Sequence, residues 1–267
     1  MYAFQYRKAK SLTEAVDLLG KDGDAKPLAG GMTLIPTLKQ RLAQPTQLVD
    51  IADLTELTGV SLAGGKLSLG AGTRHQQVAA SKEAQSAIPA LAALANGIGD
   101  PQVRNRGTIG GSVANNDPAA DYPSAVLALN ATVVTDRREI AADDFFQGLF
   151  TTALEPGELI VKIVFPVPKR AAYAKFPHPA SGYAMAGVFA AETGGGLRVA
   201  VTGAGASGVF RWSEAEAALG QSANADALKG LTLAADDLNE DIHGSREYRA
   251  QLVKVMAGRA VAALAGK

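Results

Sequence analysis

The spacing of apolar residues along the chain predicts short helices and strands in mixed order. Apolar positions 12, 15, 16 and 19 share one face of a helix over residues 11–19, and Ser11 and Glu14 have the spacing of a capping box. The same patterning predicts further helices over residues 33–42, 73–81, 87–98, 124–129, 213–219, 225–231 and 248–264. It predicts strands over residues 47–51, 60–62, 66–69, 132–134, 158–165, 183–192 and 197–202. This order is an α+β layout, without a tandem repeat or the βα alternation of a doubly wound sheet.

Two breaks in the pattern predict domain boundaries. One is the composition change at Thr58-Gly59, and the other is the pair Pro166 and Pro168 after a strong strand. We therefore expect one domain over residues 1–170, with subdomains of about 1–58 and 59–170, and a second domain over residues 171–267.

Composition narrows the possible functions. The 267 residues are 47% hydrophobic, and 26 basic residues balance 26 acidic ones, so no basic stripe indicates a nucleic-acid partner. No apolar run is long enough to span a bilayer, and the first residues lack a signal-peptide apolar segment. We therefore expect a cytoplasmic protein.

The chain has no cysteine and only three histidines, His75, His178 and His243. This excludes disulfides, iron–sulfur ligation and thiol nucleophiles in this chain, and the histidines lack metal-ligand spacing. No metal site is expected here. A redox function would therefore need an organic cofactor.

Two double-glycine segments carry the candidate chemistry: residues 27–34, PLAGGMTL, and residues 107–114, GTIGGSVA. Adjacent glycines permit positive φ angles, and consecutive backbone N–H groups can form an anion-binding nest. Two nests would suit the two phosphates of a dinucleotide. Each segment could also be only a hairpin turn, as expected for Gly64-Gly65 and for residues 194–196.

A third glycine-rich segment, residues 203–208, matches the Gly-x-Gly-x-x-Gly dinucleotide fingerprint. A helix should begin at its second glycine, but the following Val209-Phe210-Arg211-Trp212 has the character of a strand. About sixty residues remain, too few for a complete Rossmann domain. We interpret this segment as a bent strand or loop.

The chain resembles the FAD-binding medium subunits of the molybdenum hydroxylases, which include xanthine dehydrogenase, aerobic carbon monoxide dehydrogenase and aldehyde oxidoreductases. The resemblance extends over essentially the whole length. It rests on an ordered set of motifs: AGGMT (29–33), DPQVRNRGTIGGS (100–112), DPAAD (117–121), EPGELI (155–160) and YAKF (173–176).

This resemblance implies a vanillyl-alcohol-oxidase (PCMH-like) fold of two α+β subdomains that hold non-covalent FAD. A C-terminal α+β domain with a three-stranded sheet and helices, similar to that of the carbon monoxide dehydrogenase flavoprotein, would follow. The first double-glycine loop, residues 28–35, would wrap the pyrophosphate, and residues 108–112 would support it from the other side. Asp121 would bind a polar part of FAD, and Ile160, Ile98, Lys175 and Tyr183 would lie near its rings. The full implied set is Leu28, Ala29, Gly30, Gly31, Met32, Thr33, Leu34, Ile35, Ile98, Thr108, Ile109, Gly110, Gly111, Ser112, Asp121, Ile160, Lys175 and Tyr183, with no catalytic side chain.

Several of these positions have structural alternatives. Asp121 could cap the helix that begins near Pro123, Lys175 could be a solvated surface charge, and Tyr183 could be a core aromatic. Arg104 and Arg106 could be surface residues or could neutralise a pyrophosphate, and His75 is expected at a helix start. Ser112 and Met32 depart from the residues most frequent in the family.

The resemblance implies an electron-transfer role in a heteromeric oxidoreductase that hydroxylates or dehydrogenates carbon monoxide, aldehydes or N-heterocycles. A large subunit would carry the molybdenum cofactor and a small subunit two [2Fe–2S] clusters, and FAD here would pass electrons to an external acceptor. The assembly implied is a dimer of heterotrimers. Two other functions stay open: a stand-alone flavin oxidase, and a structural scaffold without FAD.

Overall fold

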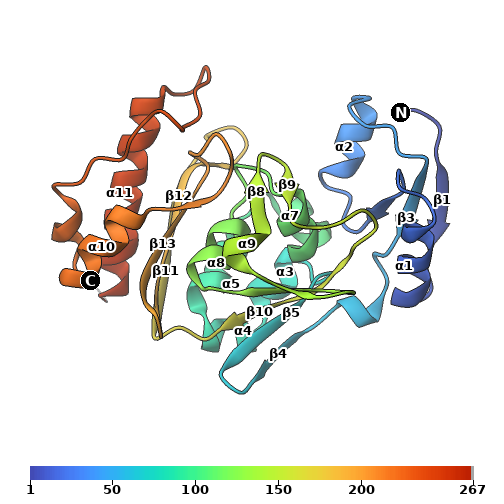
Figure 1. Ribbon diagram of the computed structural model, residues 1–267, viewed down its shortest axis with the longest axis horizontal. Helices are drawn as coiled ribbons and strands as arrows, with labels where there is room; N and C mark the ends of the chain where they lie inside the picture. The colour runs from blue at the N-terminus through green and yellow to red at the C-terminus, as the bar shows by residue number, and fades with distance from the viewer. Residues whose placement is uncertain (266–267) are drawn as a thin grey trace.

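The computed structural model describes residues 1–265, in which three sheets follow one another along the long axis of the molecule (Figure 1). The first is parallel, with strand order β1-β3-β2. It contains β1 (Gln5–Lys8), β2 (Lys26–Leu28) and β3 (Gln47–Asp50), with the helices α1 (Leu12–Gly20) and α2 (Leu34–Lys39) and the 3₁₀ turn η1 (Thr55–Leu57). Ala15 and Leu19 of α1 pack against Val49 of β3, so the apolar stripe of this helix forms the core beneath the sheet.

The central sheet is antiparallel, with strand order β4-β5-β10-β6-β7. Its strands are β4 (Val60–Ala63), β5 (Lys66–Gly70), β6 (Thr132–Thr135), β7 (Glu139–Ala141) and β10 (Ile160–Pro166). Around it lie α3 (His75–Ala80), α4 (Lys82–Ala87), α5 (Pro89–Asn96), α6 (Pro101–Arg106), α7 (Ile109–Asn115), α8 (Tyr122–Ala128) and α9 (Ala142–Phe145). A two-stranded hairpin, β8 (Phe146–Gly148) and β9 (Thr151–Thr152), stands beside α7.

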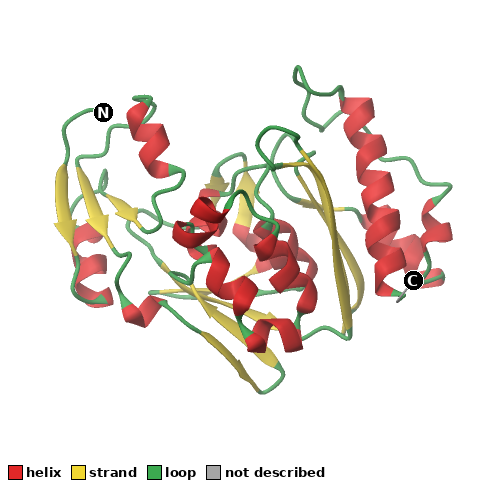
Figure 2. Ribbon diagram, turned by 180° about the vertical axis from the view of Figure 1, so that it is seen from behind, coloured by secondary structure: helices red, strands yellow, loops and turns green. Residues whose placement is uncertain are grey.

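The third sheet separates two hydrophobic cores. Its strand order is β11-β12-β13-β14, formed by β11 (Arg170–Pro177), β12 (Ala184–Thr193), β13 (Gly196–Thr202) and β14 (Phe210–Arg211). Phe189 and Ala191 of β12 pack with the central core, whereas Val188 and Ala190 pack with α10 (Ser213–Gln221), η2 (Ala225–Leu228) and α11 (Arg246–Leu264). Because neighbouring strand residues point to opposite faces, one strand contributes to both cores. Figure 2 shows this sheet between the central helices and the long C-terminal helix.

Most of the predicted elements are present. Ser11 caps α1 by accepting a hydrogen bond from the N–H of Glu14, and Gly64-Gly65 closes the β4–β5 hairpin. Residues 225–231 differ, because only a 3₁₀ turn forms there, and the fourth strand of the third sheet adds two residues to the expected three strands. The segment at residues 203–208 is a loop with Gly203 at φ +84°, so the Rossmann interpretation is rejected.

A buried carboxylate paired with a half-exposed arginine fixes the start of β10. Glu158 Oε2 lies 2.9 Å from Arg138 Nη2, its Oε1 accepts from Thr135 Oγ1 at 2.7 Å, and the backbone N–H of Glu155 donates to Oε2. Burial acts to raise the pKa of Glu158, but these hydrogen bonds and the charge of Arg138 outweigh it and lower the pKa to about 2. The carboxylate is therefore strongly preferred in the folded chain.

We expect Glu158→Gln to lower the free energy of unfolding at pH 7 by about 3 kcal/mol. The variant lacks the carboxylate, and therefore also the stabilising interactions with Arg138 and the hydrogen-bond donors that lower its pKa. A lowered pKa stabilises the fold above the ordinary value near 4.5, so the difference between wild type and variant should shrink as pH falls from 4.5 towards about 2. Urea unfolding at a series of pH values measures this. Glu155→Gln is the matched control, since Glu155 also pairs with Arg138, and with Arg137, but is 58% exposed and should cost under about 1 kcal/mol. Equal losses in both variants would contradict the assignment.

Candidate cofactor-binding site

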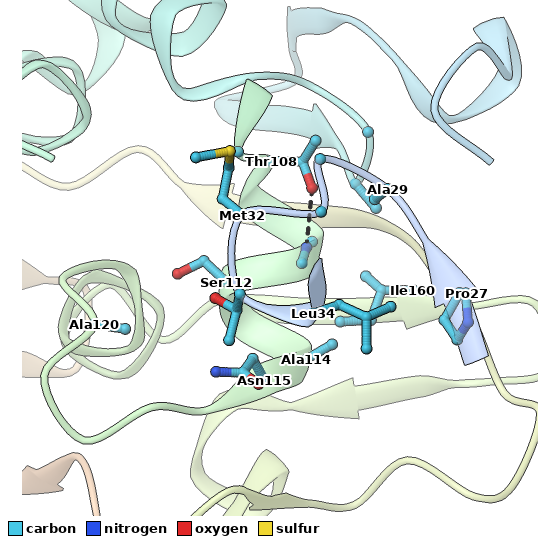
Figure 3. A pocket seen from close by; sticks show the side chains of 18 of the residues that line it. Pro27, Ala29, Met32, Leu34, Thr108, Ser112, Ala114, Asn115, Ala120 and Ile160 are labelled. Atoms are coloured by element: carbon cyan, nitrogen blue, oxygen red, sulfur yellow. Dashed lines mark hydrogen bonds between the residues drawn. The ribbon is translucent and has the colours of Figure 1, made fainter. Parts of the chain in front are cut away.

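A cavity of about 460 Å³ lies where the first and central sheets meet, within the size range of small-molecule sites. Both double-glycine segments line it, together with residues of β10 and of the turn before β12. In Figure 3 the first segment, with Ala29, Met32 and Leu34, overlies α7, which carries Ser112 and Asn115 and is capped by Thr108. Two segments about 80 residues apart in sequence therefore form one site.

The first double-glycine segment is an open turn between β2 and α2. The backbone N–H groups of Gly30, Gly31, Met32, Thr33 and Leu34 donate to no atom of residues 1–265. Ile35 is the first residue of this run whose N–H is used, donating to Gly31 O at 3.0 Å. A run of unpaired N–H groups at a cavity wall is a nest for an anion.

The two glycines of this segment are required for different physical reasons. Gly31 has φ +72°, and a side chain there would also press on Leu28 and Ile35. A Cβ on Gly30 would overlap the carbonyl oxygen of Arg106, at the end of α6. The loop can therefore lie directly on the segment that precedes the second double glycine.

The second double-glycine segment is the first turn of α7, which corrects the expectation of a second open loop. Ile109 N–H donates to Thr73 O, Gly110 N–H to Ala71 O, and Gly111 N–H to Thr108 Oγ1. No unpaired nest therefore exists at this described turn. Gly110 allows close packing, because its Cβ would lie 2.5 Å from that of Ala71. Gly111 instead faces the cavity and leaves space there.

A buried charged cluster lies behind the other end of the cavity. Lys175 Nζ is 3.0 Å from Asp121 Oδ1 and donates to the carbonyl oxygens of Gly97 (2.9 Å) and Gly182 (3.1 Å). The Tyr173 hydroxyl also donates to Asp121 Oδ1. Burial raises the pKa of Asp121, while the Lys175 charge and the Tyr173 hydrogen bond oppose that rise.

The contacts in this cluster show that Asp121 is not a side-chain helix cap and that Lys175 is not a surface charge. Asp121 makes no capping hydrogen bond to α8, and only 12% of the Lys175 side chain is exposed. Lys175 is therefore neither a surface charge nor part of the cavity wall. Lys175 binds Asp121 and the carbonyl groups of Gly97 and Gly182, which precede Ile98 and Tyr183. The side chains of Asp121, Ile98 and Tyr183 all line the cavity.

Tyr183 is 54% exposed and lines the cavity, so it is not a core aromatic. It ends the turn between β11 and β12, where the N–H of His178 donates to Tyr183 O at 2.7 Å. Partial burial and the charges of Asp117 and Asp121 raise the pKa of its hydroxyl. The ring is neutral and accessible from outside at neutral pH.

Most of the predicted site residues meet at the cavity. Its lining contains Ala29, Gly30, Gly31, Met32, Thr33, Leu34, Ile98, Thr108, Gly110, Gly111, Ser112, Asp121, Ile160 and Tyr183. Leu28 and Ile35 flank Gly31 from behind, Ile109 is fully buried in the central core, and Lys175 acts through its neighbours.

The two arginines near the second segment do not line the cavity. Arg104 donates to the carbonyl oxygens of Ile98 and Gly99 and to Gln76, so its guanidinium holds the loop before α6. Arg106 contributes its carbonyl to the close approach of Gly30. Among the described residues of the lining, Lys26 is the one Lys or Arg, so an anion here would rely mainly on backbone N–H groups.

The sequence did not point to several lining residues, including His75 and Phe150. His75 begins α3 as expected, is 5% exposed, and lies so close to Gly107 that a Cβ there would be 2.6 Å from Nε2. Burial lowers the pKa of His75 to about 4, so the imidazole is neutral at pH 7. Its Nδ1 is buried and has no hydrogen-bond partner in residues 1–265.

These residues fit FAD. The unpaired N–H groups of the first loop suit a pyrophosphate, the missing side chain at Gly111 leaves room beside it, and apolar Ile98, Leu154 and Ile160 offer surfaces for planar rings. Asp121 supplies a hydrogen-bond acceptor at the wall. Among the described residues, no cluster of side chains suits a metal ion, and no helix has the length and apolarity to cross a membrane.

Comparison with known proteins gives a consistent result. Residues 2–168 match the family model described as the FAD binding domain in molybdopterin dehydrogenase. The glyceraldehyde dehydrogenase medium chain of Sulfolobus acidocaldarius is 37% identical, with 96% of each chain covered. The carbon monoxide dehydrogenase medium chain of Hydrogenophaga pseudoflava is 36% identical, covering 97% of this chain and 96% of that one. A chain of reconstituted CO dehydrogenase from Oligotropha carboxidovorans superposes with a TM-score of 0.92 at 35% identity, over 99% of this chain and 98% of that chain.

Proposed function

The chain belongs to the family of FAD-binding medium subunits of the molybdenum hydroxylases, and we propose that it binds FAD without a covalent bond and serves as the electron exit of such an enzyme. The observation that carries the proposal is the run of unpaired N–H groups at residues 30–34, which line one cavity together with α7. When bound, the flavin supplies the redox chemistry, since it exchanges electrons singly or in pairs.

Each part of the cavity has a defined task in this proposal. The first loop holds the pyrophosphate, Thr108 fixes the first turn of α7 that carries Gly111 and Ser112, and Asp121 accepts a hydrogen bond from the cofactor. Lys175 is a positioning residue, because it orients Asp121 and the segments of Ile98 and Tyr183. Neutral His75 supports Gly107 and adds no charge to the wall.

The partners of this chain follow from its family. As the family membership implies, we infer that a small subunit carries [2Fe–2S] clusters and a large subunit the molybdenum cofactor. The absence of cysteine from this chain agrees with this division, because thiolates ligate such clusters. Electrons from those centres would leave through this subunit to an external acceptor. The two medium-chain relatives are named for different substrates, glyceraldehyde and carbon monoxide, so specificity is assigned to the large subunit.

We propose finer features as well. Residues 1–170 form the FAD-binding domain, with subdomains of about 1–58 and 59–170, and residues 171–267 form the C-terminal domain. The strands of the three sheets lie within residues 5–50, 60–166 and 170–211, which supports this division to within one residue. The complete enzyme is a dimer of heterotrimers in the cytoplasm.

Purification from the native host through a tag on this chain tests the proposed function. We expect bound FAD, iron–sulfur absorption, and two further subunits of which one contains molybdenum. A yellow chain that oxidises a substrate without partners would indicate a flavin oxidase instead. A colourless chain that stays free of flavin after incubation with FAD would indicate a scaffold, and either result would contradict the proposal.

A further inference from the structure

Phe150 is an aromatic residue in an unusual position. It lies in the turn between β8 and β9, is 56% exposed, and lines the cavity. Its backbone has φ +52°, a left-handed conformation that is unfavourable for a bulky residue. Such conformations persist only where the surrounding structure enforces them, and they gather at functional sites.

Asn116 enforces this turn. Its Nδ2 donates to Gly148 O at 2.8 Å and to Thr151 O at 2.9 Å, so one amide holds both sides of Phe150. Asn116 is 1% exposed and is the left-handed C-cap of α7, with φ 44°. The helix whose first turn carries Gly111 and Ser112 therefore fixes, at its other end, the position of Phe150.

We propose that Phe150 is a cofactor-contact residue whose phenyl ring packs against a planar ring of the bound dinucleotide. This inference rests on the proposed function. A phenyl side chain has no polar group, so it does not recognise a phosphate or a ribityl hydroxyl, whereas it can stack one face on a heteroaromatic ring. The isoalloxazine and the adenine share this chemistry.

The neighbouring residue supports the choice of Phe150. Leu149 occupies the same turn and is 52% exposed, but it does not line the cavity. Of the two residues in this turn, Phe150 has the left-handed backbone, and it is also the one whose side chain lines the cavity. Tyr183, from the separate β11–β12 turn, is the other half-exposed aromatic of the described lining.

The test is the dissociation constant of FAD for the full chain freed of flavin, measured by the change in flavin fluorescence. We expect Phe150→Ala to weaken binding about tenfold, as the loss of one aromatic contact implies. Leu149→Ala is the matched control and should stay within about twofold of wild type, and Phe150→Tyr should retain most of the affinity. Thermal unfolding without FAD shows whether each variant is folded.

Two fragments identify the ring. If Phe150→Ala weakens FMN but not ADP, the contact is with the isoalloxazine, and the opposite pattern assigns the adenine. Asn116→Ala, combined with Phe150→Ala, should cost little more than Phe150→Ala alone, because both act on one contact. An unchanged affinity in folded Phe150→Ala, while wild type binds FAD, would overturn this inference and leave the proposed function intact. A wild-type chain that does not bind FAD would overturn both.

Discussion

Gly111→Val is expected to abolish retention of FAD while leaving the chain folded. Gly111 faces the cavity, and among the described residues outside the helix's own backbone a Cβ would meet one atom within 4 Å, Thr108 Oγ1 at 3.0 Å, so a shift of a few tenths of an ångström accommodates it. The valine methyl groups would then occupy space beside the pyrophosphate nest. We expect FAD affinity to fall at least about 100-fold, the cost of roughly 3 kcal/mol of lost contacts and overlap.

The position of this substitution matters. A side chain at Gly30 or Gly110 would strike the backbone of Arg106 or Ala71, so loss of FAD there would not be separable from misfolding. Gly258→Val is the matched control, because Gly258 is also helical and a Cβ there meets nothing within 4 Å in the described part of the chain outside its own helix backbone. Flavin content after desalting and circular dichroism of both variants measure the effect. Normal flavin content in folded Gly111→Val would contradict the assignment of this turn to the cofactor.

Lys175→Met is expected to lower the free energy of unfolding without FAD by about 3–5 kcal/mol at pH 7, because it leaves the buried Asp121 carboxylate without its cation. Loss of the ammonium raises the pKa of Asp121 further in the folded chain. A group with a raised carboxyl pKa is destabilising above that pKa, so the deficit should be smaller at pH 5 than at pH 8. Urea unfolding at these two values measures it.

Adding Asp121→Asn to Lys175→Met provides the control. An amide needs no counter-charge, so the double variant should regain at least about 1 kcal/mol relative to Lys175→Met alone. If the single and double variants unfold at the same urea concentration, Lys175 acts only by tying Gly97 and Gly182 together, and the ion-pair account is wrong.

The sequence predicted helices and hairpins well where a neighbouring residue sets the boundary of the element. Ser11 caps α1, and glycines at residues 64–65 and 194–196 close hairpins, because these effects depend on neighbouring residues alone. Family membership was predicted from the ordered motifs and is confirmed by the match over residues 2–168.

Predictions that depend on tertiary contacts were less complete. The N–H groups of Ile109 and Gly110 donate to the carbonyl oxygens of Thr73 and Ala71, 36 and 39 residues earlier, so the sequence did not show that the second double glycine is closed by hydrogen bonds. Asp121 has the spacing of a helix cap, but Tyr173 and Lys175 from the third sheet bind its carboxylate. Phe150 gave no local signal because its backbone conformation is set by Asn116, which lies 34 positions before it.

The flavin content of the wild-type chain tests the central claim most directly. The purified chain would be incubated with excess FAD, desalted, and its absorption spectrum compared with that of Gly111→Val treated in the same way. We expect about one FAD for each wild-type chain, released intact on denaturation because no covalent bond holds it, and almost none for the variant. A wild-type chain without flavin, or equal flavin in both, would contradict the assignment of this cavity to FAD.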